Sequence, residues 1–489
     1  MGNSYALTIK NLTKTLHDNH VLRGLDFAVE ESEIHAILGL NETGKTTLVK
    51  IIAGLIPPDS GEFYYYGKKV KSFTSNFLKH NGGEIVYDQS YLFPHFSVAH
   101  NVCFQPDKLI RLTEAAKHTQ EIFDKLQINI DPTVQVNALN RAQKKLVDFA
   151  RIMHNNPRFV LLDEPFELLS AQEIIPLIKM LKELRDSGGS VLITCHRLHD
   201  VIRLADRVSI LSGGKIQKQL AAEEITVSDI LSLLSDNKVS DPYPKINTTL
   251  GRPIMQVRNL SIPQLMQNIS FDLHEGEILG FHGDSTSGRN VLGKTIFGAM
   301  PDYYGHIFIN GARLRPGCPE DAVKNGIAYV PEDPYSLGIF SNLNVINNLF
   351  SVYGNISGRI TYDTEASYST FNYQLKQTNL LPRNPDGKMH YLSAGMVQKI
   401  NLLKWFFTQS KIFIFDEPTI NVDSIAKVDI YNLLNDLIKK GAGVMLISSD
   451  IYELAGMCDR IIILENGKIS AELNPKEKLS DDIFIKGFI

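Results

Sequence analysis

Gly39-Leu40-Asn41-Glu42-Thr43-Gly44-Lys45-Thr46 fits the pattern G-x-x-x-x-G-K-[ST] at every fixed position. The apolar run before it, residues 33–39, predicts a buried strand, and Thr47–Ala53 after it predicts a helix. A strand that leads into a glycine loop and then a helix is the context in which this pattern binds phosphate. The stretch therefore predicts an α/β domain with a nucleotide site at the start of its helix.

The expected chemistry of this loop follows from its residue types. Gly39 and Gly44 allow backbone N–H groups to turn inward around phosphate oxygens. Lys45 is expected to reach the β and γ phosphates, and the Thr46 hydroxyl to ligate Mg²⁺. The predicted nucleotide-binding residues of the loop are Gly39, Leu40, Asn41, Glu42, Thr43, Gly44, Lys45, Thr46 and Thr47.

A second loop lies 244 residues further along the chain. Gly283-Asp284-Ser285-Thr286-Ser287-Gly288-Arg289-Asn290 keeps both glycines but replaces Lys-Thr by Arg-Asn. Asn81-Gly82 recurs as Asn325-Gly326 with the same displacement, and Asp163-Glu164-Pro165 recurs as Asp416-Glu417-Pro418, displaced by 253 residues. An offset that is constant and then changes once indicates a duplication. The second copy has a net insertion of nine residues, between about residues 335 and 390.

The stretch around Ser235–Pro253 is rich in Asp, Ser, Asn, Pro and Gly and predicts a surface linker. We therefore place two domains at residues 1–235 and 253–489, joined by a linker at 236–252.

In each copy an apolar strand runs into Asp-Glu and precedes an amphipathic helix. In the first copy we expect this helix to bury Ile174, Ile175, Leu177, Ile178, Leu181 and Leu184. Alternating strands and helices indicate an α/β fold with parallel strands at its centre.

Asp163 ends a predicted buried strand, where a carboxylate is costly unless it meets a cation. We expect that cation to be Mg²⁺, with Thr46 and Asp163 as its ligands. Glu164 suits a general base that activates an attacking water. His196 follows the predicted strand Val191–Thr194, and we expect it to contact the γ-phosphate.

The composition of the chain bounds the remaining function classes. The 489 residues exceed what one hydrophobic core usually contains, and a net charge of −4 argues against a chain built to coat nucleic acid. The four cysteines form no C-x-x-C pair, which favours reduced thiols in a cytosolic protein. We find neither a signal-peptide pattern nor an apolar run of ~18 residues. A role at a membrane would therefore require a partner.

A further segment points to a family. Leu392-Ser393-Ala394-Gly395-Met396 lies shortly before the second Asp-Glu strand, and Leu139-Asn140-Arg141-Ala142-Gln143 lies before the first. The chain resembles the ATP-binding cassette (ABC) ATPases, whose signature Leu-Ser-Gly-Gly-Gln occupies this position. The second copy matches the signature well and the first copy poorly. The resemblance implies two tandem domains, each with a mixed β-sheet core and a helical subdomain.

The closer resemblance is to the duplicated ATPases of bacterial importers for ribose, galactose, xylose and similar solutes, and it covers nearly the whole chain. The second copy shares with them the Gly-x-x-x-x-Gly-Arg loop, the segment Val330-Pro331-Glu332-Asp333, and Ser448-Ser449 where the first copy has His196. This resemblance implies an ATPase at the cytoplasmic face of the cell membrane. Its implied partners are two integral-membrane permease subunits and, indirectly, an extracytoplasmic solute-binding protein, with no nucleic acid.

In this family each ATP lies between the loop of one copy and the signature of the other. The resemblance therefore implies one active site that combines the first loop, Asp163, Glu164 and His196 with Ser393 and Gly395. The other site is implied to be degenerate, with weak or static nucleotide binding. Its residues are Gly283, Gly288, Arg289, Asn290, Asp416 and Glu417.

Two departures from the family pattern keep other interpretations open. Asp88 stands where the family usually has glutamine, and Ala394 stands where it usually has glycine. These departures favour one alternative, a non-hydrolysing ATP-dependent regulatory scaffold. The other alternative is a soluble twin-cassette ATPase acting on ribosomes or nucleic acid. The aromatic segments Tyr91–Phe96 and Tyr335–Phe340 fit either a permease-binding surface or core packing. The transported solute is not encoded in this chain.

Overall fold

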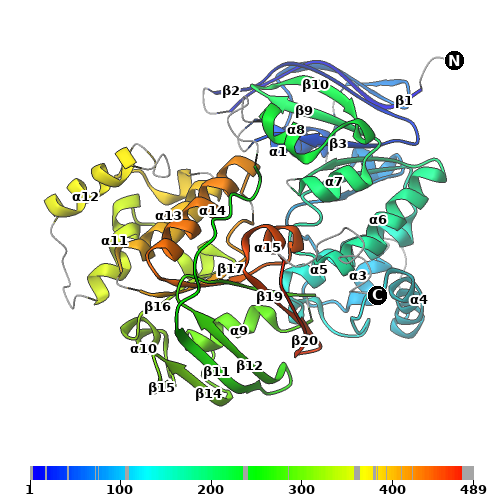
Figure 1. Cartoon of the computed structure of the whole chain (residues 1–489). Helices are drawn as coiled ribbons and strands as arrows, with labels where there is room; N and C mark the ends of the chain where they lie inside the picture. The colour runs from blue at the N-terminus through cyan, green and yellow to red at the C-terminus, as the bar shows by residue number, and fades with distance from the viewer. Residues whose placement is uncertain are drawn as a thin grey trace. The chain divides into compact units, whose positions relative to one another are not determined.

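The computed structural model divides the chain into two compact units (Figure 1). Unit 1 comprises Met1–Pro242 with Asp423–Ile425, and unit 2 comprises Tyr243–Val422 with Ala426–Ile489. Each unit contains one of the two glycine loops. The structure describes residues 4–16, 19–40, 43–71, 73–74, 76–104, 110–195, 197–234, 241–284, 286–356, 364–377, 382, 384–392, 394–408, 410–420 and 422–475.

Unit 1 is built on two β-sheets. The smaller, antiparallel sheet has the strand order β2 (Asn19–Glu30), β1 (Tyr5–Leu16), β4 (Ser60–Tyr65), β5 (Lys68–Val70). The larger sheet has the order β10 (Lys215–Ala221), β9 (Arg207–Ser212), β3 (Ile34–Leu38), β8 (Ser190–Thr194), β7 (Phe159–Asp163), β6 (Gly83–Val86). Strands β9 to β6 of this order run parallel, and β10 pairs antiparallel with β9. The predicted sheet with parallel strands at its centre is therefore confirmed.

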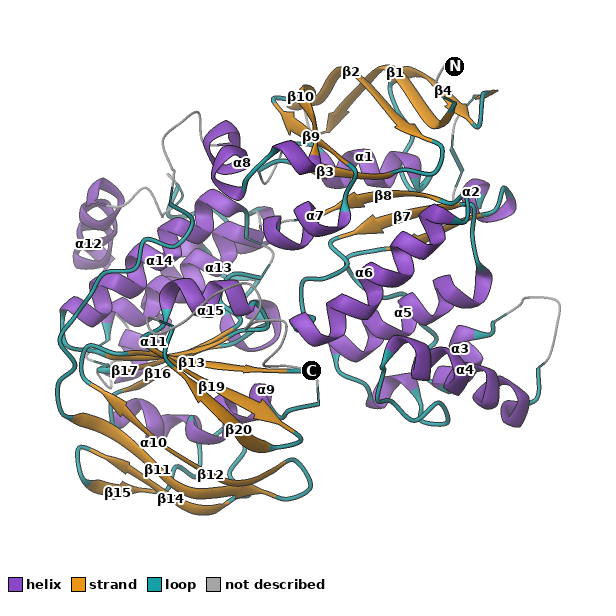
Figure 2. Ribbon diagram, turned by 45° about the vertical axis from the view of Figure 1, so that its right-hand side comes forward, coloured by secondary structure: helices purple, strands orange, loops and turns teal. Residues whose placement is uncertain are grey.

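The helices of unit 1 fall into two groups. Helices α3, α4 and α5 pack against one another as a helical subdomain, which Figure 2 shows beside α6. The others accompany the sheets. In chain order the helices are α1 (Lys45–Ile52), α2 (Phe77–His80), α3 (Val98–Val102), α4 (Leu112–Leu126), α5 (Arg141–Asn155), α6 (Ala171–Asp186), α7 (Leu198–Leu204) and α8 (Val227–Leu234).

Unit 2 repeats this arrangement. Its small sheet has the order β12 (Met266–His274), β11 (Pro253–Ile262), β14 (Tyr304–Ile309), β15 (Ala312–Leu314). Its large sheet has the order β16 (Ile327–Val330), β17 (Ile412–Asp416), β18 (Gly443–Ile447), β13 (Ile278–Gly283), β19 (Arg460–Glu465), β20 (Lys468–Leu473). The equal strand orders show that the duplication seen in the sequence extends to the fold.

The helices of unit 2 correspond in order to those of unit 1. Helices α11 and α13 share an apolar core that includes Val345, Leu349, Val397 and Ile400. A π-helical turn, η3 (Pro334–Gly338), precedes them. The α-helices are α9 (Arg289–Ile296), α10 (Pro319–Lys324), α11 (Val345–Ile356), α12 (Thr364–Gln377), α13 (Ala394–Leu403), α14 (Ser424–Lys439) and α15 (Ile451–Met457).

Burial explains why the central strands were readable from the sequence. Every residue of β3, β7 and β8 is buried, as expected for parallel strands covered on both faces. The helix predicted after the first Asp-Glu pair is α6, which Ser170 caps together with Glu173. One member of its predicted apolar stripe is wrong: Ile175 is 44% exposed, because it lies beside the stripe rather than within it.

The described part of the predicted linker is tied to unit 2. Lys245 pairs with Asp459 at 2.9 Å, the Asn435 amide donates to Pro244 O at 2.5 Å, and Thr248 Oγ1 donates to Gly276 O at 2.6 Å. Through these contacts residues 243–248 are part of unit 2. Among the helices that the structure describes, none combines the length and hydropathy needed to cross a bilayer.

Candidate functional site

The glycine loop of unit 1 joins β3 to α1 and requires glycine at two positions. Gly44 has a φ of 105° and caps the N-terminus of α1. A Cβ on Gly44 would lie 2.7 Å from Leu22 Cδ2, and one on Gly39 would lie 2.6 Å from Leu211 O. A side chain at either position would therefore collide with the sheet or strain the backbone. The predicted loop residues Asn41 and Glu42 lie outside the described residues.

Lys45 folds back over this loop. Its Nζ donates to Gly39 O at 2.6 Å and to Leu40 O at 3.0 Å, and Thr43 Oγ1 also donates to Leu40 O, at 2.8 Å. The Lys45 side chain is buried, and this burial lowers its pKa, against the opposing charges of nearby acidic residues that include Glu164. Of the two threonines that follow, Thr46 is exposed and Thr47 is half-buried.

Asp163 ends β7 beside this loop. In the sheet β8 lies between β3 and β7, and Thr194 of β8 is in register with both Ile37 and Asp163. Thr194 Oγ1 donates to Asp163 Oδ1 at 2.5 Å. Burial raises the pKa of Asp163, while the Thr194 hydrogen bond and Lys45 act in the opposite direction. The strand ends thus bring a buried carboxylate and a buried ammonium to the same edge of the sheet.

The residue after each strand-ending aspartate has an unusual backbone. Glu164 has a φ of 45° and Glu417 a φ of 49°. Both values lie in the left-handed region, which residues other than glycine rarely adopt. In both copies the backbone N–H donates to the neighbouring strand: Glu164 N to Thr194 O at 3.1 Å, and Glu417 N to Ile447 O at 2.9 Å. Backbone strain of this kind concentrates at functional sites.

His196 lies outside the described residues, whereas its neighbour Arg197 is described and has several contacts. Arg197 is buried, its Nη1 donates to Phe166 O at 2.9 Å and to Leu169 O at 2.6 Å, and its Nε pairs with Asp200 at 2.8 Å. These contacts hold the segment after Asp163-Glu164 against the end of β8. The sequence analysis missed Arg197, because no motif marks it.

The loop of unit 2 has a different hydrogen-bond pattern. Gly288 caps α9 with a φ of 83°, as Gly44 caps α1. Arg289 forms a buried ion pair with Glu417, whose carboxylate also accepts from Ser449 N at 2.7 Å and Ser449 Oγ at 3.3 Å. Burial raises the pKa of Glu417 to about 7 even with Arg289 beside it. The sequence analysis placed Arg289 in the degenerate nucleotide site and did not foresee this pair.

Asp416 has its own partner in unit 2. Tyr329 OH of β16 donates to Asp416 Oδ2 at 2.8 Å, where unit 1 uses Thr194. Asp416 is 1% exposed, and burial raises its pKa to about 7. The remaining predicted member of the degenerate site, Asn290, is half-buried in the first turn of α9, and Gly283 ends β13.

The two signature segments begin corresponding helices. In unit 1 Asn140 caps α5: its Oδ1 accepts from Gln143 N at 2.8 Å and its N donates to Gln143 Oε1 at 3.1 Å. Lys145 on the same helix donates to Tyr87 O and to Asp88 O, which fixes the segment around Asp88. In unit 2 Gly395 is buried in the first turn of α13, and Ser393 lies outside the described residues.

The two aromatic segments lie at the surface. Tyr91, Phe93 and Phe96 are 70%, 48% and 47% exposed, and Tyr335 and Phe340 are 48% and 60% exposed. Core packing, one of the two interpretations left open from the sequence, is therefore wrong for these side chains.

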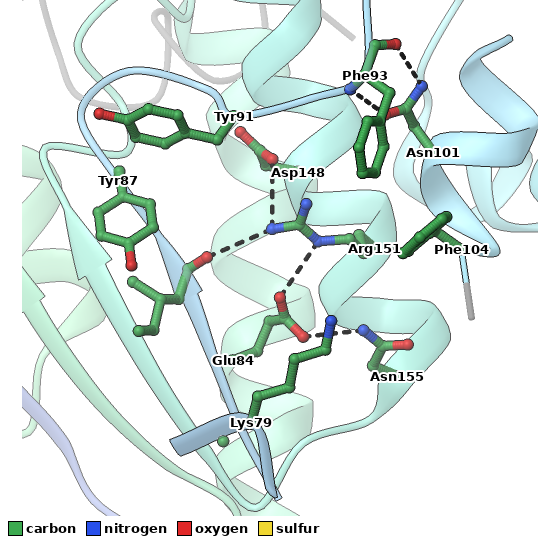
Figure 3. A pocket seen from close by; sticks show the side chains of 12 residues that line it. Lys79, Glu84, Tyr87, Tyr91, Phe93, Asn101, Phe104, Asp148, Arg151 and Asn155 are labelled. Carbon is green, nitrogen blue, oxygen red and sulfur yellow. Dashed lines mark hydrogen bonds and ion pairs between the residues drawn. The ribbon is translucent and has the colours of Figure 1, made fainter. Parts of the chain in front are cut away.

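Unit 1 has a cavity of about 270 Å³ beside its aromatic segment (Figure 3). At its centre Arg151 Nε lies 3.2 Å from Glu84 Oε1, and Arg151 Nη2 lies 3.6 Å from Asp148 Oδ1 and 3.4 Å from Ile85 O. The wall also includes rings from Tyr87, Tyr91, Phe93 and Phe104. The cavity is thus lined by charged side chains and by aromatic rings.

One known protein family matches a segment of each unit. The model of a family described as "ABC transporter" matches residues 22–167 and 266–420, one segment in each unit. The chain belongs to the ABC transporter family. The two ABC segments contain both glycine loops and both Asp-Glu strands, and the family binds ATP.

Relatives match almost the whole chain. "Ribose import ATP-binding protein RbsA 3" of Rhizobium meliloti is 31% identical over 479 residues, covering 97% of this chain and 95% of the relative. The protein of the same name from Rubrobacter xylanophilus is 30% identical, covering 93% and 92%. A solved nucleotide-free cassette of an ABC transporter shares 23% identity and covers 48% of this chain and 97% of its own, with a TM-score of 0.40.

Proposed function

We propose that this ABC protein is the ATP-hydrolysing subunit of an importer that takes up a monosaccharide or similar small solute through separate permease subunits. The observation that carries the proposal is the grouping of the intact loop, Lys45 and Asp163-Glu164 at one sheet edge of unit 1. The full-length similarity to ribose import ATP-binding proteins supports the transport assignment. Which solute is carried is decided by other subunits.

In the proposed reaction the loop N–H groups and Lys45 bind the phosphates of ATP. Lys45 exchanges its hydrogen bonds to Gly39 O and Leu40 O for phosphate oxygens, which places its charge on the γ-phosphate. Glu164 accepts a proton from the attacking water as general base. His196 is proposed to contact the γ-phosphate, and Ser393 and Gly395 are the further residues proposed to bind ATP.

The residues of unit 1 fit a magnesium ion. Asp163 offers a buried carboxylate whose Oδ2 has no hydrogen-bond partner among the described residues, and the exposed Thr46 offers a hydroxyl. Oxygen ligands of this kind suit Mg²⁺, which usually binds one or two protein oxygens together with phosphates. When bound, Mg²⁺ supplies charge that stabilises the phosphoryl group during transfer. Thr46 and Asp163 are accordingly the proposed ligands.

Unit 2 is proposed to bind nucleotide weakly or statically. Its acidic residue Glu417 is held by Arg289 and Ser449, and the loop lacks the lysine and the hydroxyl of unit 1. The exposed aromatic segments of both units are the proposed contacts with two permease subunits. The proposal accordingly includes a location at the cytoplasmic face of the membrane, a solute-binding protein as an indirect partner, and no nucleic acid.

The proposal is tested by co-expressing the chain with the membrane subunits encoded by neighbouring reading frames. We expect the subunits to co-purify in detergent and to hydrolyse ATP, and vesicles containing them to take up labelled pentose or hexose when a solute-binding protein is added. ATP hydrolysis without membrane association, together with co-sedimentation with ribosomes, would favour the twin-cassette alternative. ATP binding without hydrolysis would favour the scaffold.

A further inference from the structure

A buried lysine of unit 1 connects the helical subdomain to the segment that follows β6. Lys145 lies on α5 and is only 5% exposed. Its Nζ donates to Tyr87 O, and to Asp88 O at 2.8 Å. The Lys145 side chain therefore fixes the backbone of both residues that come directly after the strand.

The segment that Lys145 holds leaves the sheet at the proposed nucleotide site. Strands β6 and β7 run parallel, and their last paired residues are Val86 and Leu162. Asp163 follows Leu162 directly, and Asp88 follows Val86 by two residues. Both acidic residues therefore lie at the same edge of the sheet, where we propose that the phosphates of ATP bind.

Four charged groups interact at this edge. Burial raises the pKa of Asp163, and the negative charge of Asp88 acts in the same direction. The positive charges of Lys145 and Lys45 act against this shift. Because ATP would bring several further negative charges here, an Asp88 carboxylate beside it needs a compensating positive charge.

The two carbonyls alone do not explain why residue 145 is a lysine, since a side-chain amide also has two N–H donors. A buried ammonium is costly unless acidic groups lie near it. Burial lowers the pKa of Lys145, and the charge of Asp148 opposes this shift most, followed by that of Asp88. Asp148 already has Arg151 Nη2 at 3.6 Å (Figure 3). The charge of Lys145 is therefore available to Asp88.

Unit 2 has a neutral residue at the matching position. Gln398 corresponds to Lys145 at the offset of 253 residues, and Glu332 corresponds to Asp88 at the offset of 244. Gln398 is 2% exposed, and neither polar atom of its amide has a hydrogen-bond partner among the described residues. The lysine thus belongs to the unit whose loop is intact, and the degenerate unit lacks it.

We propose that Lys145 is a positioning residue for ATP hydrolysis in unit 1. It holds Tyr87 and Asp88 by their carbonyls, and its positive charge compensates the Asp88 carboxylate beside the bound triphosphate. The inference rests on the proposed function and deepens it. It explains how this chain has an aspartate where the family usually has a neutral glutamine. Lys145 acts through Asp88 and needs no contact with ATP.

The test separates charge compensation from a purely structural contact. Lys145→Gln removes the positive charge but keeps two N–H donors, and Asp88→Asn removes the negative charge at nearly the same size. The two single variants and the double variant are purified as the full chain. Steady-state hydrolysis gives kcat and KM for Mg-ATP, and thermal unfolding checks the fold. Lys144→Gln, which removes the charge of the next lysine on α5, is the control.

We expect Lys145→Gln to lower kcat/KM for ATP about tenfold, and Lys144→Gln to stay within about threefold of wild type. In the Asp88→Asn background the same Lys145→Gln change should cost less than about threefold, because no carboxylate then needs compensation. Equal losses in both backgrounds, or no loss in either, would overturn this inference alone. A wild-type chain that binds ATP without hydrolysing it would overturn the proposed function as well.

Asp88→Asn by itself covers the case in which Lys145→Gln does not fold. This variant leaves the charge of Lys145 in excess beside the triphosphate, so we expect the Kd for ATP to fall about threefold. Titration with a fluorescent ATP analogue measures the change. An unchanged or larger Kd would contradict an Asp88 carboxylate that faces the triphosphate.

Discussion

The loops of the two units use their cations in different ways. In unit 1 Lys45 donates to carbonyls of its own loop, Gly39 O and Leu40 O, bonds that a phosphate can replace. In unit 2 Arg289 pairs with Glu417, which Ser449 also holds. A buried ion pair is costly to separate because each charge would be left without compensation. The cation of the unit 1 loop is thus available to a ligand, whereas the arginine that replaces it in the unit 2 loop is held in an internal ion pair.

The largest expected difference concerns the two glutamates. Glu164→Gln should lower kcat for ATP about 100-fold or more, since it removes the proposed general base. Glu417→Gln should leave kcat close to the wild-type value, because Glu417 already pairs with Arg289. Steady-state ATP hydrolysis by the purified chain measures both. A Glu417→Gln variant as inactive as Glu164→Gln would remove the distinction between the units.

The cations of the two loops should differ in what they support. Lys45→Ala should weaken ATP binding about tenfold or more, because it deletes a charge-assisted hydrogen bond to phosphate. Titration with a fluorescent ATP analogue measures this loss. The unfolding of unit 2 should change little in this variant.

Arg289→Ala should instead destabilise unit 2 by about 3–5 kcal/mol, since it leaves the Glu417 carboxylate buried without its cation. Trp405, the single tryptophan of the chain, is buried in unit 2 and reports its unfolding in urea. The control is Arg289→Met combined with Glu417→Gln, which should recover much of the loss. An Arg289→Ala variant as stable as wild type would show that the pair contributes nothing.

The strand-ending aspartate of unit 2 should make its stability depend on pH. Burial raises the pKa of Asp416 in the folded unit to about 7, above the value of 3.8 for an ordinary aspartate. Between these values the folded state keeps a proton that the unfolded state has lost, so stability falls as pH rises through 7. The slope is roughly 1.4 kcal/mol per pH unit at most.

Urea unfolding followed by Trp405 fluorescence at pH 5, 6, 7 and 8 measures this dependence. Asp416→Asn cannot lose a proton at this position, so its free energy of unfolding should depend less on pH over the same range. Parallel pH profiles for wild type and Asp416→Asn would contradict the assignment.

The smallest expected effect lies at the degenerate signature of unit 1. Asn140→Ala should destabilise unit 1 by about 1 kcal/mol, because it removes the hydrogen bond that caps α5. Asn140→Ser keeps a capping oxygen and should be nearly neutral. Thermal unfolding of the two variants separates them. A neutral Asn140→Ala would show that Gln143 alone maintains the helix start.

Much of the fold could be predicted from local pattern. The strands before the glycine loops and before Asp163 and Asp416 are continuous apolar runs, because parallel strands are buried on both faces. The exposed Ile175 shows the limit of this logic, since helical periodicity does not say how wide the buried stripe is. The partners of Glu417 were also beyond prediction, because Arg289 and Ser449 are far from it in sequence.

The amino-acid sequence alone determined that the chain is duplicated, that one loop keeps its lysine, and which acidic residues follow each strand. These are properties of residue type and spacing, so they can be inferred without the three-dimensional structure. Only the tertiary structure decided that Arg289 pairs with Glu417, that Tyr329 replaces Thr194 as the partner of the aspartate, and that the buried Lys404 ammonium donates to Gly338 O. Each of these joins side chains or carbonyls from separate segments, and their meeting depends on how strands and helices pack.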